Sequence, residues 1–144
     1  MPLEVTEVTA DAEFRELVDV QWASFEQPYC RLIRLFFPIL SESPSARAAA
    51  FSESVDRQLQ WHKADPTSHW IKVVDNESGK IVGAAVWHVY KENLYVTVSD
   101  EECTWYPAGE GRDMANSLME QFLTPRMQYM AKPQMCKKAR LRVA

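Results

Sequence analysis

The sequence predicts an α+β fold with a small, mostly antiparallel sheet of about three to four strands, packed with three to four helices. The first observation is a β-hairpin pattern over residues 69–90, where two runs of strand-forming residues flank a turn at 75–80 that contains Gly79. The second is helical spacing of apolar residues in three segments, 10–25, 45–64 and 112–130.

The second run of the hairpin is apolar on both of its alternating faces. One face carries Ile81, Gly83, Ala85, Trp87 and Val89, and the other carries Val82, Ala84, Val86, His88 and Tyr90. A strand with two apolar faces is usually covered on both. We therefore expect residues 81–90 at the centre of the sheet.

The elements before the hairpin follow from local signals. Residues 3–8 alternate as a short strand, and Thr9 is placed to cap a helix over residues 10–25 that ends before Pro28. A short buried helix is expected within residues 29–37. Ser43 or Ser45 then caps a helix that ends near Ala64.

After the hairpin, residues 94–98 can add a short strand, and residues 112–130 have helical spacing. The large apolar residues of this last helix lie on one side, namely Met114, Leu118, Phe122, Met127 and Met130. Pro125 indicates a kink or a fresh start. The basic end of the chain suits either a terminal strand at 139–144 or disorder.

Composition excludes several classes of function. The formal net charge of −4 argues against general nucleic-acid binding, which needs a basic surface. The longest apolar run, residues 32–40, is interrupted by Arg34 and Pro38 and is too short to span a membrane. Three widely spaced cysteines and the lack of a signal-peptide pattern favour a reducing, cytoplasmic location.

Four motifs carry a resemblance to a known family. They are Phe-Glu-Gln-Pro-Tyr at 25–29, Lys-Ile-Val-Gly-Ala-Ala-Val-Trp at 80–87, Thr-Trp-Tyr-Pro at 104–107 with Gly-Glu-Gly-Arg at 109–112, and Phe-Leu-Thr-Pro-Arg at 122–126. In this order the chain resembles the N-terminal half of the GNAT N-acetyltransferase superfamily, and in detail the small-molecule GNATs of filamentous fungi. The resemblance implies a truncated GNAT-like domain over residues 1–132, followed by a divergent basic tail at 133–144.

The resemblance also implies what the chain does not bind. In the family, a long strand and a Gln/Arg-x-x-Gly-x-Gly/Ala loop follow the last of these helices, and that loop binds the coenzyme A pyrophosphate. The chain has a basic segment there, so we expect no acetyl-CoA cofactor. Gly109 and Gly111 precede a helix, but Glu110 between them disfavours phosphate. The cysteines and histidines lack paired spacing, so no metal is expected.

His88 and Tyr90 are the first candidates for catalysis because they share one face of the predicted strand. His88 is expected inside the fold, where it serves either as an acid or base or as a hydrogen-bonded core residue. His62 and His69 are expected at the surface.

Residues after the first predicted helix are the second group of candidates. In GNATs this connection borders the acceptor-substrate pocket, so the resemblance implies a substrate-side role for Glu26, Tyr29 and Arg31. Glu26 and Tyr29 would also supply proton transfer. The alternative is an exposed polar loop.

Aromatic side chains are the third group. Five of them would line a pocket for a flat small molecule: Trp22, Phe25, Trp87, Trp105 and Tyr106. The alternative is that these rings fill the core.

Two classes of function follow. The first is a GNAT-related small-molecule enzyme of secondary metabolism, an isomerase or cyclase that uses acid–base residues without a cofactor. The alternatives are an N-acetyltransferase-like protein by family only, or a non-catalytic protein that binds a ligand or dimerises. The strand at 81–90 would otherwise lose a neighbour, which either a tail that folds back or the pairing of two chains would remedy. In either class we expect a homodimer or larger oligomer.

Overall fold

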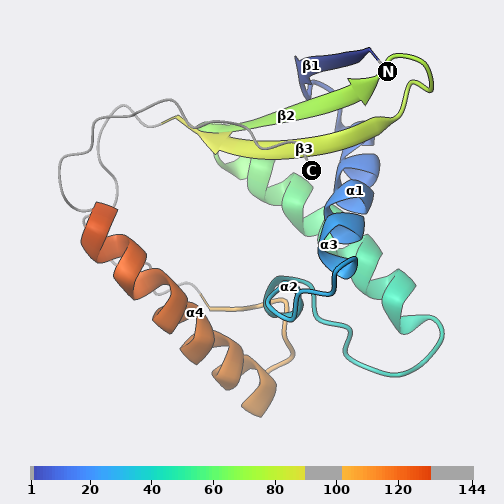
Figure 1. Ribbon diagram of the computed structural model, residues 1–144. Coiled ribbons are helices and arrows are strands. Elements are labelled where there is room, and N and C mark those ends of the chain that lie inside the picture. Colours follow the sequence, from blue (N-terminus) through green and yellow to red (C-terminus); the bar gives the residue numbers. More distant parts are fainter. Residues whose placement is uncertain (1, 90–101, 131–144) are drawn as a thin grey trace. The chain divides into compact units, whose positions relative to one another are not determined.

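The computed structural model describes residues 2–89 and 102–130 (Figure 1). In chain order these residues form β1 (Leu3–Glu7), the 3-10 helix η1 (Asp11–Glu13), α1 (Phe14–Glu26), α2 (Ile33–Phe36), α3 (Ala46–Ala64), β2 (Ser68–Asp75), β3 (Ile81–His88) and α4 (Glu110–Met130). The predicted α+β class is confirmed. The described residues fall into two compact units, one made of 2–31 and 39–89 and the other of 32–38 and 102–130.

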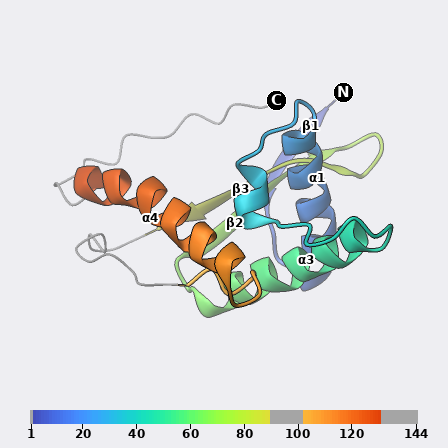
Figure 2. The same ribbon diagram turned by 90° about the horizontal axis from the view of Figure 1, so that it is seen from below.

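The first unit is a three-stranded antiparallel sheet with two helices on one face. The strand order is β1-β2-β3, with Val5 paired to Val73 in one ladder and Ser68 paired to His88 in the other. Both α1 and α3 lie on the same side of the sheet (Figures 1 and 2). The predicted strand at 3–8, helix ending at Ala64 and hairpin are therefore confirmed.

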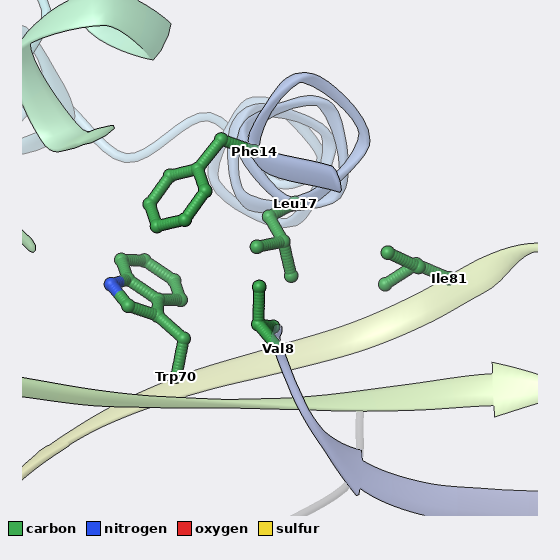
Figure 3. Close-up of a cluster of buried hydrophobic side chains, with 5 residues drawn as sticks. All are labelled: Val8, Phe14, Leu17, Trp70 and Ile81. Atoms are coloured by element: carbon green, nitrogen blue, oxygen red, sulfur yellow. The ribbon is translucent and has the colours of Figure 1, made fainter. Parts of the chain in front are cut away.

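The core of this unit lies between α1 and the sheet. Figure 3 shows Phe14 and Leu17 of α1 against Val8, Trp70 and Ile81, and all five side chains are buried. The rings of Phe14 and Trp70 meet edge to face, with centroids 5.6 Å apart. These contacts link all three strand regions to α1.

The expectation that residues 81–90 form the centre of the sheet is wrong for the residues that the structure describes. There β2 is the middle strand, and β3 pairs with β2 alone. The apolar pattern of residues 81–90 wrongly indicated a strand covered on both faces, because Gly83, Ala84 and Ala85 count as apolar but are small and bury little surface. Valine favours strands even where it is exposed, so Val82 and Val86 do not require a cover; their exposed fractions are 44% and 43%.

The start of α1 is built differently from the prediction. Thr9 does not cap the helix with its hydroxyl; instead the N–H groups of Thr9 and Ala10 both donate to Glu13 Oε2, each at 3.3 Å. Glu13 also pairs with Lys72 of β2, and both contacts hold the Glu13 pKa below its ordinary value. One carboxylate thus connects the start of the helix to the sheet.

The second unit has its own small core. Leu35 of α2 packs with Cys103 and with Ala115 of α4. The expected apolar side of α4 is wrong in detail, because Met114 and Leu118 are exposed whereas Ala115 is buried. Next to Ala115, the Oδ1 of Asn116 accepts the Cys103 N–H at 2.8 Å, so this side of α4 lies against the cluster.

Several sequence predictions fall on residues that the structure does not describe. These are the strand at 94–98, the tail at 133–144 with its possible strand at 139–144, and the candidate Tyr90. Among the helices in residues 2–89 and 102–130, none combines the length and apolar character that a membrane crossing needs.

Leu17→Ala tests the core of the first unit. Leu17 is fully buried against the sheet, so we expect the free energy of unfolding to fall by about 2–5 kcal/mol through lost contacts and a residual cavity. Urea denaturation measures this. Val5→Ala is the control, because Val5 is 58% exposed and should change stability by less than about 0.5 kcal/mol. Equal losses in the two variants would contradict the described core.

Candidate functional site

Polar side chains gather where β2 begins and β3 ends. We call Asp65, Thr67 and His88 the His88 cluster. Asp65 and Thr67 lie in the short connection between α3 and β2, and His88 is the last residue of β3. Because β2 and β3 are antiparallel and Ser68 pairs with His88, the register brings this connection beside the His88 ring.

The connection has its shape for local reasons. Helix α3 ends at Ala64, and Asp65 takes an extended backbone, which is the conformation that a following proline favours. The Asp65 side chain then accepts from the backbone N–H of Thr67, two residues on, in an Asx turn. The Ser68 N–H donates to the Asp65 carbonyl at 3.1 Å and starts β2.

The carboxylate of Asp65 divides its two oxygens between two partners. Oδ1 accepts from the Thr67 backbone N–H at 2.8 Å and from the Thr67 hydroxyl at 2.7 Å. Oδ2 lies 3.0 Å from Nδ1 of His88. Nδ1 is also 3.4 Å from the Thr67 hydroxyl oxygen. This is the geometry of a histidine oriented by a carboxylate.

Electrostatics favour an ionised Asp65. The hydroxyl and N–H of Thr67 lower the Asp65 pKa most, and the nearby His88 lowers it further, while partial burial acts against them. Both side chains of the pair are a little more than a third exposed. A negative carboxylate therefore faces a histidine that a solute can approach.

A second histidine lies next to this cluster. Nδ1 of His62 is 3.1 Å from the hydroxyl oxygen of the buried Ser68. The His62 ring also stacks on Phe14, with centroids 5.3 Å apart. The expected positions of His88 and His62 are therefore wrong: His88 is exposed, and His62 is partly buried against the core, whereas His69 is partly exposed as expected. The physical reason is that α3 turns His62 inward while β3 turns His88 toward the connection.

A third histidine provides a comparison within the same sheet. Nδ1 of His69 in β2 lies 2.9 Å from Oε1 of Glu7 in β1. The side chains of this pair are 44% and 55% exposed. The described residues thus contain two histidine–carboxylate pairs, His88–Asp65 and His69–Glu7, with similar lengths in different surroundings.

The second group of predicted site residues lies at the C-terminal end of α1 and just after it. Glu26 forms an ion pair with Arg47 of α3, with Oε2 2.7 Å from Nη2. Glu26 and Tyr29 also form an isolated β-bridge, and Tyr29, Phe25 and Arg31 are exposed. This group is separate from the His88 cluster in the contacts that the structure shows for residues 2–31 and 39–89.

The predicted aromatic residues are distributed over both units. Trp22 is 2% exposed and packs edge to face on Phe51 of α3, with centroids 5.6 Å apart. Trp87 is half-buried in β3, on the strand face opposite to His88. In the second unit, Trp105 Nε1 donates to the Leu35 carbonyl at 2.8 Å.

Tyr106 has a similar role beside Trp105. Its hydroxyl donates to the Arg34 carbonyl at 2.7 Å, and its own carbonyl accepts two bonds from Arg112. Burial raises the Tyr106 pKa, with a smaller contribution from Cys103. Both rings therefore connect the 102–109 segment to α2 through hydrogen bonds.

A surface hollow of about 430 Å³ lies along α1 and α3 and is lined by Ala12, Arg15, Glu16, Asp19 and Phe51. It contains none of the predicted site residues and none of the His88 cluster. Across residues 2–89 and 102–130, no three His, Cys, Asp or Glu side chains are grouped so as to hold a metal ion.

Asp65 and Thr67 are the residues that sequence reasoning missed. Their signal was the Asp-Pro-Thr segment directly after a helix, which is typical of an Asx turn, but nothing local indicated that His88 would lie beside it. No family model, curated protein or solved structure matches the chain. The geometry of the described residues is therefore the basis for function.

Asp65→Asn tests the charge state of this cluster. Because the folded-state pKa is lowered, the ionised carboxylate stabilises the fold above the unfolded pKa of about 3.9, and this stability is lost as pH falls through the lower folded value. The variant should be less stable than the parent at pH 7, and the difference should shrink below about pH 4.

Urea denaturation over a pH series measures this difference. Asp56→Asn is the control on an exposed position of α3, where we expect a change within about 0.5 kcal/mol at pH 7. A stability difference between the parent and Asp65→Asn that is constant from pH 7 to pH 2.5 would contradict the assigned charge state.

Proposed function

We propose that the chain is a small-molecule enzyme that acts by general acid–base catalysis, with His88 as the base and Asp65 as the residue that orients it. The observation that carries this proposal is the 3.0 Å separation of His88 Nδ1 and Asp65 Oδ2 at an exposed strand end. Histidine–carboxylate pairs of this kind serve in proton transfer.

The chemistry follows from the pairing. A negative carboxylate accepts a hydrogen bond, so the Nδ1 of neutral His88 carries the hydrogen and the lone pair is on Nε2. Nε2 can then remove a proton from a substrate carbon or hydroxyl. The Asp65 charge stabilises the imidazolium that forms, and a well-placed base contributes about 10²–10⁴-fold to the rate.

Glu26 is less suited to the same task in this geometry. Its carboxylate is paired with Arg47, whose guanidinium also lies 5.2 Å from the centroid of the Trp22 ring. The pairing stabilises the ionised forms of both groups and raises the Arg47 pKa. We therefore assign proton transfer to His88 and keep a substrate-side role for Tyr29 and Arg31 as part of the proposal.

An isomerisation or cyclisation of a small molecule is the reaction class that we propose. Such reactions move a proton within one substrate and need no acyl donor. The order β1, η1, α1, α2, α3, β2, β3, α4 supports the proposed relation to the GNAT superfamily. Calorimetric titration with coenzyme A separates the two chemistries, because tight binding would favour acetyl transfer over the cofactor-independent reaction.

A benzisoxazole that opens when a base removes its ring proton is a suitable probe for His88. We expect the parent chain to accelerate the opening over buffer, and His88→Gln to lose about 10²-fold or more of that acceleration. Absorbance of the phenolate product measures the rate of opening.

His69→Gln is the matched control, because it removes the other histidine–carboxylate pair of the sheet. It should keep the parent rate. A parent chain no faster than buffer, or a His88→Gln variant as fast as the parent, would overturn the assignment of His88 as the base.

A homodimer is the second proposal, and the exposed valines of β3 support it. Val82 and Val86 are 44% and 43% exposed, and Val89, which follows the strand, is 63% exposed. Val82 and Val86 share one face of β3, opposite to the buried Ile81, whereas Val89 alternates to the other face. Exposed apolar side chains on one face of a strand favour association with a second apolar surface. A second copy of the chain is the partner that we propose.

Light scattering at micromolar concentration tests this proposal. We expect twice the mass of the chain for the parent and the mass of one chain for Val82→Lys with Val86→Lys, since two buried lysines would be unfavourable. Gln60→Lys on an exposed position of α3 is the control and should leave the mass unchanged. A parent mass of one chain would contradict the dimer.

A further inference from the structure

We infer that Thr67 is a positioning residue of the His88 site: its hydroxyl and backbone N–H hold the Asp65 carboxylate so that Oδ2 faces the His88 ring. The inference rests on the proposed function for what the site does, but the geometry of the cluster can be tested separately. Thr67 itself does not contact the reacting atoms in this scheme.

Two donors from one residue determine how the carboxylate is oriented. The Thr67 N–H and hydroxyl both donate to Oδ1, at 2.8 and 2.7 Å. A carboxylate held at one oxygen by two short charge-assisted bonds has little freedom to rotate. Oδ2 is consequently directed at Nδ1 of His88, 3.0 Å away.

The backbone places Thr67 in the same ladder as the histidine. The Thr67 carbonyl accepts from the Val89 N–H at 3.0 Å, directly after His88 in the chain. Ser68, which follows Thr67, is paired with His88 across the two strands. Thr67, the last residue of the connection, is therefore held to the end of β3 by a backbone hydrogen bond next to His88.

The His69–Glu7 pair shows what the sheet provides without such a residue. Its Nδ1–Oε1 separation of 2.9 Å matches the His88–Asp65 distance. Among the residues that the structure describes, His69 is the one hydrogen-bond donor to the Glu7 carboxylate. Glu7 also reaches its partner through one more methylene than Asp65. The two pairs thus differ mainly in one respect: Thr67 holds the Asp65 carboxylate, and no comparable donor holds the Glu7 carboxylate among the described residues.

A fixed carboxylate has a chemical consequence for the proposed base. When Oδ2 is held toward Nδ1, the tautomer with hydrogen on Nδ1 is stabilised and Nε2 remains basic. When the carboxylate rotates, Nδ1 loses its acceptor for part of the time, and the tautomer with hydrogen on Nε2 becomes populated. That second tautomer cannot take a proton at Nε2.

Thr67→Val and Thr67→Ser form the test. Valine preserves the branched shape and removes the hydroxyl, whereas serine keeps the hydroxyl. The readout is the ¹⁵N shift of the two ring nitrogens of His88, which reports the tautomer of the neutral ring. We expect the Nδ1–H form to dominate in the parent and in Thr67→Ser, and a mixture in Thr67→Val.

The benzisoxazole rate gives a second readout. We expect about a three- to tenfold loss in Thr67→Val, since one of the two bonds to Oδ1 remains, and recovery in Thr67→Ser. The His69 ring is the internal control and should keep the same ¹⁵N shifts in every variant. If Thr67→Val fails to fold, Thr67→Ala removes the same hydroxyl and is judged by the same shifts.

The outcomes separate this inference from the proposed function. A parent-like His88 tautomer in a folded Thr67→Val or Thr67→Ala variant would overturn the positioning role, whatever the rate. A tautomer change in Thr67→Val that is absent in Thr67→Ser would support the role of Thr67, whatever the rate of His88→Gln. A His88→Gln variant as fast as the parent would overturn only the assignment of His88 as the base.

Discussion

The antiparallel register between β2 and β3 determines most of what the first unit contains. It pairs Ser68 with His88 at one end of the hairpin and Val74 with Ile81 at the other. The same alignment sends Trp70 into the core against Phe14. A slip by one residue would reverse the face of every side chain on a strand. The core and the polar cluster thus depend on one alignment.

The polar cluster and the core also share the last turns of α3. His62 stacks on Phe14 and reaches the hydroxyl of Ser68, and Asp65 follows one residue after the end of the helix. Side chains supported by helices and strands keep their geometry better than side chains on long loops. The His88 cluster therefore lies directly beside the core contacts of His62 and Ser68.

The two proposals use different parts of β3. Proton transfer uses its last residue, His88, where the strand meets the turn that contains Asp65. Dimerisation uses the exposed valines along the strand, and a second chain there would exclude water near the site. Excluded water strengthens the interaction between an ionised carboxylate and an imidazole. The two proposals are therefore compatible on one strand.

The sequence by itself determined the elements and the class of fold. Spacing of apolar residues and turn chemistry located the first strand, the helices and the hairpin, because these signals act over a few neighbouring residues. They also determined which residues could be chemically active, and His88 was among them. They did not determine burial on β3, where small residues and exposed valines look like core residues in a sequence.

Only the tertiary structure decided which polar groups meet. Asp65 and His88 are separated by 23 residues, and the hairpin register that joins them has no local signature. The same holds for Glu26 with Arg47, which are brought together by the packing of α1 on α3. The contacts that orient a histidine or neutralise a carboxylate arise from packing between elements, and for that physical reason the sequence could name the candidates but not their partners.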